Sequence, residues 1–242
     1  AQASAAAARR PLLIIIAIAP RTEPKRQPRA RARLREGAEA GDITVMTTPT
    51  REIELKFLLD AAAAGTVLSA LPPAETRVVD MAATYFDTAD HWLRRNGFGL
   101  RVRRTGAERI QTLKSALGAD GGRDEWEWPV EHDTPEAALL TATPAALPAG
   151  AVLVPLFTVI SRRALRMVEA DGALIELVID DARVEAGDRV DAFLELELEL
   201  KAGDVGALEA LAARLSAVAR LTPTGLTKAG RGFRLLGAGG LT

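Results

Sequence analysis

Charged side chains at alternate positions are the residues of this sequence whose spacing could support chemistry. In the segment 51–57, Glu52, Glu54 and Lys56 alternate with an isoleucine, a leucine and a phenylalanine. Successive side chains of a β-strand point to opposite faces, so the charged groups share one face and the apolar residues share the other. By itself this is the pattern of a half-buried strand with a solvated face. Two carboxylates and an ammonium are also suited to hold a metal ion and an anion.

The same alternation recurs in later segments, which indicates further strands with one charged face. The clearest is 193–201, where glutamates at alternate positions lie opposite four leucines. The charges segregate by strand, because the first and last strands are acidic and those around residues 101 and 114 are basic. The charged residues in phase within each segment are Arg101 and Arg103; Lys114; Arg123, Glu125 and Glu127; Glu176 and Asp180; and Glu195, Glu197, Glu199 and Lys201.

Enclosing many carboxylates beside arginines and lysines would be costly unless a ligand lay between them. Oxygen donors without histidine or cysteine suit Mg²⁺ or Mn²⁺, while arginine and lysine suit phosphate oxygens. The sequence therefore predicts a site for a metal-bound polyanion, most simply a chain of phosphates. No Ser-His-Asp set, Walker loop or dinucleotide fingerprint competes with this interpretation, because residues 97–99 (Gly-Phe-Gly) lack the strand-turn-helix context of a dinucleotide site.

The composition is that of a globular protein, since 242 residues of which 48% are hydrophobic can bury a sizeable core. The chain has no cysteine and two histidines, so any metal must be held by carboxylates. Residues 1–45 carry nine basic and four acidic residues, which leaves 22 of the 31 basic and 28 of the 32 acidic residues for the remainder. This mildly acidic remainder argues against nucleic acid as a partner.

The N-terminal segment 1–48 has the composition of a basic extension that cannot form a core, and we expect it to be disordered. Its apolar run, residues 12–19, is too short to span a bilayer, and Pro20 would sit badly after a secretory cleavage site. We therefore expect a cytoplasmic protein without a membrane partner. Met46 is the first methionine, so we expect the native start there and residues 1–45 to be an upstream extension. The folded domain is predicted over residues 49–238.

The predicted elements are eight strands and few helices, which indicates an α+β fold. The amphipathic helices 61–71 and 204–219, capped by Asp60 and Asp204, need an apolar partner, and the apolar faces of the strands provide it. If the sheet stayed open, its charged faces would form a solvated surface. Closing it into an eight-stranded antiparallel β-barrel would remove its edges and collect the charges inside. The strands are predicted over 51–57, 77–86, 99–104, 109–114, 123–128, 157–169, 173–180 and 193–201, with a short helix and loop over 134–156 and a closing helix after the loop that begins at residue 223.

These residues resemble the CYTH superfamily, the triphosphate tunnel metalloenzymes. Glu52-x-Glu54-x-Lys56 is similar to the family's ExExK signature, and further blocks follow in family order over nearly all of residues 50–236. The blocks are Tyr85-Phe86-Asp87-Thr88, Leu100 to Arg103, Thr112 to Lys114, Arg123-x-Glu125-x-Glu127, Arg163, Glu176 to Asp180, Glu195 to Glu199 and Thr227-Lys228. The sequence looks closest to the bacterial inorganic triphosphatases, although the C-terminal CHAD domain that often accompanies them is absent from this sequence.

The resemblance implies metal-dependent hydrolysis of inorganic triphosphate to diphosphate and phosphate by a monomer or homodimer. Thiamine triphosphatase, class IV adenylate cyclase and a polyphosphate-binding module without turnover are alternatives. The implied catalytic residues are Glu52, Glu54, Lys56, Glu127 and Asp180. The implied phosphate-binding residues are Lys56, Arg101, Arg103, Lys114, Arg123, Arg163 and Lys228. The implied ligands of Mg²⁺ or Mn²⁺ are Glu52, Glu54, Glu125, Glu195, Glu197 and Glu199.

Several residues also have a purely structural interpretation. Glu199 could be solvated near the end of its strand, and Arg162 competes with Arg163 for one inward position. We expect Arg231 to cap the closing helix rather than to contact a ligand. The tryptophans at 92, 126 and 128 are expected in the core, and His91 and His132 are not expected to bind metal.

Overall fold

The computed structural model describes residues 48–237. The predictions for the basic N-terminal segment, including a native start at Met46, fall almost entirely outside these residues. Among the described helices, none has the length and apolar character needed to cross a membrane.

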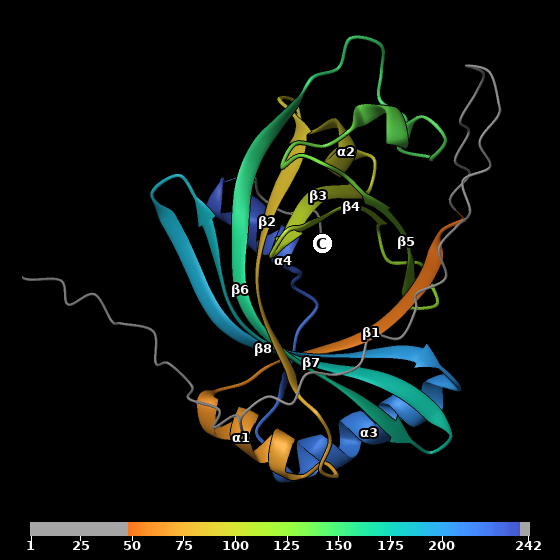
Figure 1. Ribbon diagram of the computed structural model, residues 1–242, viewed down its shortest axis with the longest axis vertical. Coiled ribbons are helices and arrows are strands. Elements are labelled where there is room, and N and C mark those ends of the chain that lie inside the picture. The colour runs from red at the N-terminus through yellow and green to blue at the C-terminus, as the bar shows by residue number, and fades with distance from the viewer. Residues whose placement is uncertain (1–47, 238–242) are drawn as a thin grey trace, which may run out of the picture. The chain divides into compact units, whose positions relative to one another are not determined.

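Eight strands form one closed antiparallel sheet, as the sequence predicted (Figure 1). Their order is β5-β4-β3-β2-β6-β7-β8-β1, and pairing of β1 with β5 closes the ring. The two-residue strand β9 (Thr222–Pro223) adds to the end of β1. The barrel strands are β1 (Thr50–Leu58), β2 (Arg77–Thr88), β3 (Phe98–Thr105), β4 (Glu108–Ser115), β5 (Gly122–Pro129), β6 (Leu153–Ala170), β7 (Ala173–Ala186) and β8 (Arg189–Ala202).

Strand β1 is shared between two neighbours along its length. Its residues 50–53 pair with β5, and its residues 54–58 pair with β8. The charged side chains of β1 therefore lie where the two ends of the sheet meet.

Helices α1, α3 and α4 each begin at a residue whose side chain caps the helix. Asp60 accepts a hydrogen bond from the Ala63 amide at 2.8 Å, and Asp204 accepts one from the Gly206 amide at 2.7 Å, which confirms both predicted caps. Thr227 Oγ1 accepts from the Gly230 amide at 2.9 Å and begins the closing helix. The helices are α1 (Ala61–Ser69), α2 (Trp92–Arg95), the 3₁₀ helix η1 (Ala137–Leu140), α3 (Val205–Val218) and α4 (Lys228–Leu235).

Helices α1 and α3 cover the outer, apolar face of the strands around β7 and β8 (Figure 1). Leu196 and Leu198 of β8 are fully buried there, together with Leu208 of α3. Because these leucines point outward from the barrel, the glutamates that alternate with them point inward. The burial of the leucine face thus fixes the direction of the charged face.

A second cluster packs outside β3, β4 and β5. Trp126 and Trp128 are buried in it with Leu100, Leu113 and Leu140, as expected of core tryptophans. The buried Asp87 carboxylate at the end of β2 accepts hydrogen bonds from two amides of α2, at 2.8 and 3.0 Å, and so fixes that helix against the strand.

Helix α4 packs against the inner face of the barrel. Its Phe233 lies edge-on to Phe157, which stacks on Tyr85 with ring centroids 4.8 Å apart. Gly232 allows this close approach, because a Cβ atom there would lie 2.2 Å from the Phe157 ring. The first residue of α4, Lys228, is thereby brought to the interior.

Strands β6, β7 and β8 are longer than the sequence predicted. Residues 153–156, 181–186 and 189–192 were predicted as irregular but belong to these strands. Val184 and Ala186 alternate with exposed or half-buried charged residues and pack inward near α4, so the period-two pattern continues further than the prediction allowed. The turn falls instead at Gly187, which has a positive φ of 62°.

Candidate active site

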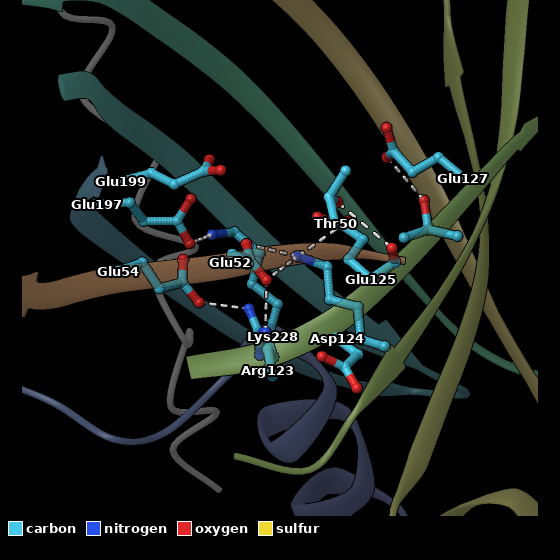
Figure 2. A network of polar contacts seen from close by, with 12 residues as sticks. Thr50, Glu52, Glu54, Arg123, Asp124, Glu125, Glu127, Glu197, Glu199 and Lys228 are labelled. Atoms are coloured by element: carbon cyan, nitrogen blue, oxygen red, sulfur yellow. Dashed lines mark hydrogen bonds and ion pairs between the residues drawn. The ribbon is translucent and has the colours of Figure 1, made fainter. Parts of the chain in front are cut away.

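The interior of the barrel contains a cavity of about 1180 Å³ whose wall is built by all eight barrel strands and α4. Charged side chains of β1, β3, β4, β5 and β8 meet on this wall. Figure 2 shows contacts that join Glu52 and Glu54 of β1 to cations such as Arg123 of β5, with Glu197 and Glu199 of β8 alongside.

Glu52 is held between two cations. Lys114 Nζ lies 2.8 and 2.9 Å from the two carboxylate oxygens of Glu52, and Arg123 Nε donates to Glu52 Oε2 at 2.6 Å. Burial raises the pKa of Glu52, but the charges of Lys114 and Arg123 outweigh burial and lower the pKa to about 2. This carboxylate is therefore ionised throughout the neutral range.

Glu54 and Lys56 extend the same network along β1. Lys56 Nζ lies 2.9 Å from Glu54 Oε1 and 3.2 Å from Glu197 Oε1, and Arg123 also donates to Glu54. Burial lowers the pKa of Lys56, but the charges of Glu197 and Glu54 give a net upward shift, so its ammonium stays protonated.

A tighter group surrounds Lys228. One oxygen from each of Asp180, Glu195 and Glu197 lies within 4.8 Å of the others, and we call these three residues the ammonium site. Lys228 Nζ lies 3.0 Å from Asp180 Oδ2 and 2.8 Å from Glu197 Oε1, and it also donates to Glu195. Burial alone would raise the pKa of Glu197, but the charges of Lys228 and other cations hold it well below its ordinary value.

Two arginines of β3 lie side by side on the cavity wall. Burial lowers the pKa of Arg101, but Tyr85, Glu125 and Glu127 outweigh burial and raise it. Arg101 Nε is buried and has no hydrogen-bond partner among the described residues. Burial lowers the pKa of Arg103, and the charges of Arg101 and Arg163 lower it further, while Glu127 opposes them from 3.3 Å. We call Arg101, Arg103 and Arg163 the arginine group. Such crowding of guanidinium groups favours an anionic ligand.

Three carboxylates crowd on the wall formed by β1, β7 and β8. Glu199 pairs in register with Glu54 on one side and with Glu176 on the other, and we call these three residues the carboxylate row. Burial raises the pKa of Glu199, and the charges of Glu52 and Glu176 add to that rise, although Lys201 Nζ, 2.7 Å away, opposes it. Within residues 48–237, Glu176 has no hydrogen bond or ion pair. Such crowding favours a cation.

A profile of the CYTH domain matches residues 50–233, which include all eight barrel strands and most of the residues that line the cavity. The chain belongs to the CYTH domain family. The closed eight-stranded antiparallel barrel with a few helices is the fold that the sequence predicted.

Two relatives illustrate what this CYTH domain is similar to. The inorganic triphosphatase of Haemophilus influenzae is 33% identical over 127 residues, covering 50% of this chain and 36% of that protein, so the match spans about a third of the relative's length. A solved structure of a candidate adenylyl cyclase from Hippeastrum, described as revealing a dominant triphosphatase activity, has a TM-score of 0.55 at 20% identity. It covers 81% of this chain and 98% of its own, and it shows the shared fold.

Most of the predicted site residues lie on the cavity wall of the CYTH domain. Asp180 and Glu195 do not, since both are fully buried beneath it, at 0% exposure. Arg163 faces the cavity and Arg162 is exposed outside it. The predicted residues on the wall are Glu52, Glu54, Lys56, Arg101, Arg103, Lys114, Arg123, Glu125, Glu127, Arg163, Glu197, Glu199 and Lys228.

The predicted role of Arg231 as a cap was wrong. Arg231 Nη1 donates to Asp191 Oδ2 at 2.7 Å, and its guanidinium lies over the Phe193 ring, 3.9 Å from the centroid. The cap of α4 is Thr227, whose hydroxyl is short enough to reach the free amide of Gly230.

The wall residues that were given no role by the sequence prediction include Tyr85, Glu176 and Lys201. Glu176 and Lys201 lie at the same alternate positions of their strands as Asp180 and Glu199, so the alternation alone could have predicted that they face the cavity. Tyr85 pairs in register with Arg101, and this contact depends on the pairing of β2 with β3. Burial raises the pKa of Tyr85, but the Arg101 charge outweighs it and lowers the pKa.

The residues of this CYTH domain fit Mg²⁺ or Mn²⁺, because the cavity offers many carboxylate oxygens and no described histidine or cysteine on its wall. The ammonium site has the closest set of oxygens, but the Lys228 ammonium already lies among them. The carboxylate row faces the cavity, and although Lys56 and Arg123 contact Glu54 and Lys201 contacts Glu199, no ammonium lies among all three carboxylates, so its donor set suits an added cation.

Proposed function

We propose that this CYTH domain hydrolyses inorganic triphosphate (tripolyphosphate) to diphosphate and phosphate with Mg²⁺ or Mn²⁺. The observation that carries the proposal is that carboxylates and guanidinium groups gather in separate regions of one cavity. Carboxylates crowd at Glu54, Glu176 and Glu199, while guanidiniums crowd at Arg101 and Arg103. A metal-bound triphosphate offers the cation and the polyanion that these two regions lack.

The arginine group would bind the phosphate chain. A guanidinium can donate two parallel hydrogen bonds to phosphate oxygens, and the buried Arg101 Nε is a donor without a partner among the described residues. Lys114, Arg123 and Lys56 lie along the path from β4 to β1 and would hold the rest of the chain in line. Fixed cations at both ends also stabilise the charge of the departing diphosphate.

The carboxylate row, with Glu52 and Glu125 nearby, would hold the divalent cation. A cation bound there offsets phosphate charge and lowers the pKa of bound water. Glu127 accepts a hydrogen bond from Thr112 Oγ1 at 3.2 Å, which fixes its carboxylate in the cavity. We assign Glu127 the role of orienting the attacking water and accepting its proton. The triphosphatase descriptions of the two relatives support the reaction class.

The test is release of phosphate from tripolyphosphate, ATP and thiamine triphosphate, each with Mg²⁺, Mn²⁺ or EDTA. We expect tripolyphosphate to be the best substrate and EDTA to abolish turnover. Binding of tripolyphosphate without hydrolysis under all three conditions would refute the enzyme. Faster turnover of thiamine triphosphate, or cyclic AMP as the main product from ATP, would reassign the substrate.

A further inference from the structure

Asp180 and Glu195 are buried charges that the proposed reaction does not use. Both are fully buried, and neither contributes to the cavity wall. Burying a carboxylate is costly unless it is paired, so their partners indicate what they do.

The principal partner is Lys228, which does face the cavity. Its ammonium has three N–H donors, and it contacts one oxygen each of Asp180, Glu195 and Glu197. The ammonium thus takes the position among three carboxylates that a metal ion would otherwise occupy. Because Lys228 is the first residue of α4, these contacts also fix the start of that helix.

Asp180 holds a second wall cation. Arg163 Nε and Nη2 donate to its two oxygens at 2.8 and 2.7 Å, in the bidentate geometry that fixes a guanidinium plane. Arg163 Nη2 also donates to Glu197 Oε2 at 3.1 Å. One buried carboxylate therefore orients two of the cations that face the cavity.

We propose that the ammonium site is a positioning device rather than a metal site. Asp180 and Glu195 are positioning residues that hold Lys228 and Arg163 in the geometry needed to contact phosphate, and the Lys228 ammonium excludes a divalent ion from the three carboxylates. This inference rests on the proposed function for its kinetic consequence, while the exclusion of metal can be tested without turnover.

The first experiment measures Mn²⁺ binding by calorimetry in the absence of phosphate. Asp180→Asn and Glu195→Gln should bind Mn²⁺ within about twofold of the wild-type affinity, whereas Glu54→Gln should weaken binding at least about tenfold. Lys228→Ala should bind one additional Mn²⁺ ion, because it uncovers three carboxylate oxygens within 4.8 Å of one another. Loss of Mn²⁺ affinity in the Asp180 or Glu195 variant comparable to that in Glu54→Gln would overturn the proposal, as would unchanged stoichiometry in folded Lys228→Ala.

The second experiment measures kcat and KM for tripolyphosphate. Glu195→Gln and Asp180→Asn should lower kcat at least about tenfold, because Lys228 and Arg163 lose their fixed orientation. KM should not rise, because removal of a negative charge favours binding of the anionic substrate. Asp191→Asn is the matched control, since Asp191 also ties α4 to β8 but contacts Arg231 away from the cavity. Its kcat should stay within about twofold of the wild type. A wild-type kcat in Glu195→Gln, or an equal fall in the Asp191 control, would contradict positioning.

Folding is checked separately by thermal melting of each variant. If a single variant does not fold, the double variant Lys228→Met with Glu195→Gln should restore folding, because it removes both charges together. A double variant that is no more stable than either single variant would contradict the pairing of Lys228 with Glu195. Absence of tripolyphosphate turnover or of Mn²⁺ binding in the wild type would refute the proposed function alone, because the number of Mn²⁺ ions bound by Lys228→Ala tests the exclusion of metal separately.

Discussion

The carboxylate row and the ammonium site are each three carboxylates on neighbouring strands, yet their charges are balanced differently. In the ammonium site the chain supplies its own cation, because α4 places Lys228 among Asp180, Glu195 and Glu197. In the row, the Glu176 side chain makes no hydrogen bond or ion pair within residues 48–237, and the pKa of Glu199 is raised. An ammonium of the chain itself occupies the first group of carboxylates, whereas no ammonium lies among all three carboxylates of the row, where we propose that a metal ion binds.

The largest effect should follow loss of a row carboxylate. Glu54→Gln should keep the fold and lower metal-dependent kcat for tripolyphosphate at least about 100-fold, the cost of removing a group that stabilises charge in the transition state. Phosphate release with Mn²⁺ is the measurement. Glu209→Gln, an exposed carboxylate of α3, is the control and should be unchanged. Near-normal turnover in Glu54→Gln would remove the row from the reaction.

Glu52 tests a wall carboxylate whose charge is fully balanced. Its folded pKa of about 2 lies below the ordinary 4.5, so its ionic contacts stabilise the fold above pH 4.5 and are lost as the pH falls toward 2. The difference corresponds to about 3 kcal/mol. Urea unfolding in EDTA should give a much larger free energy of unfolding for the wild type than for Glu52→Gln at pH 7, and a smaller difference at pH 2.5. A difference in stability that does not change with pH would contradict the ionic pairing of Glu52 with Lys114 and Arg123.

Displacing α4 should disturb the ammonium site without changing any of its residues. Gly232→Ala places a methyl group 2.2 Å from the Phe157 ring, so α4 must shift. Overpacking of this kind costs roughly 1–3 kcal/mol. We expect lower thermal stability and lower kcat, with Mn²⁺ affinity retained because the carboxylate row is elsewhere on the wall. Gly225→Ala, where no atom lies within 4 Å of the added Cβ, is the control.

The arginine group should respond to a change of shape at constant charge. Arg101→Lys keeps one positive charge but cannot donate two parallel hydrogen bonds, so KM for tripolyphosphate should rise about tenfold. Steady-state kinetics with saturating Mn²⁺ measure this. An unchanged KM would mean that Arg101 acts only through its charge.

The smallest effect is the change in melting temperature of Glu199→Gln, and we expect its sign to depend on whether metal is present. A carboxyl whose folded pKa is raised destabilises the fold when ionised, so stability falls as the pH rises through that pKa. Glu199→Gln should therefore melt slightly higher than wild type at pH 7 in EDTA. With Mn²⁺ the order should reverse, because bound metal stabilises only the wild-type row. The same order in both buffers would argue against a metal contact at Glu199.

The alternation of charged and apolar residues was enough to predict the eight strands and the inward face of most site residues. It works because a buried outer face, such as that of Leu196 and Leu198, leaves the neighbouring glutamates only one direction. It could not separate Glu195 from Glu199, which have the same phase. Their different surroundings depend on α4, which packs on Phe157. This packing places Lys228 against Glu195, although the two residues are distant in the sequence.

The double pairing of β1 has a consequence for how the barrel folds. Residues 50–53 pair with residues 122–125, and residues 54–58 pair with residues 195–199, so both partners of the first strand come much later in the chain. Closing such long loops lowers the entropy of the chain before the contacts between the strands can stabilise them. We therefore expect closure to be a slow, late step. Glu52, Glu54 and Lys56 lie on the strand that closes last, so we expect a folding intermediate without these strand pairings to lack the proposed metal site. Recovery of Mn²⁺ binding during refolding would therefore report closure of the ring itself.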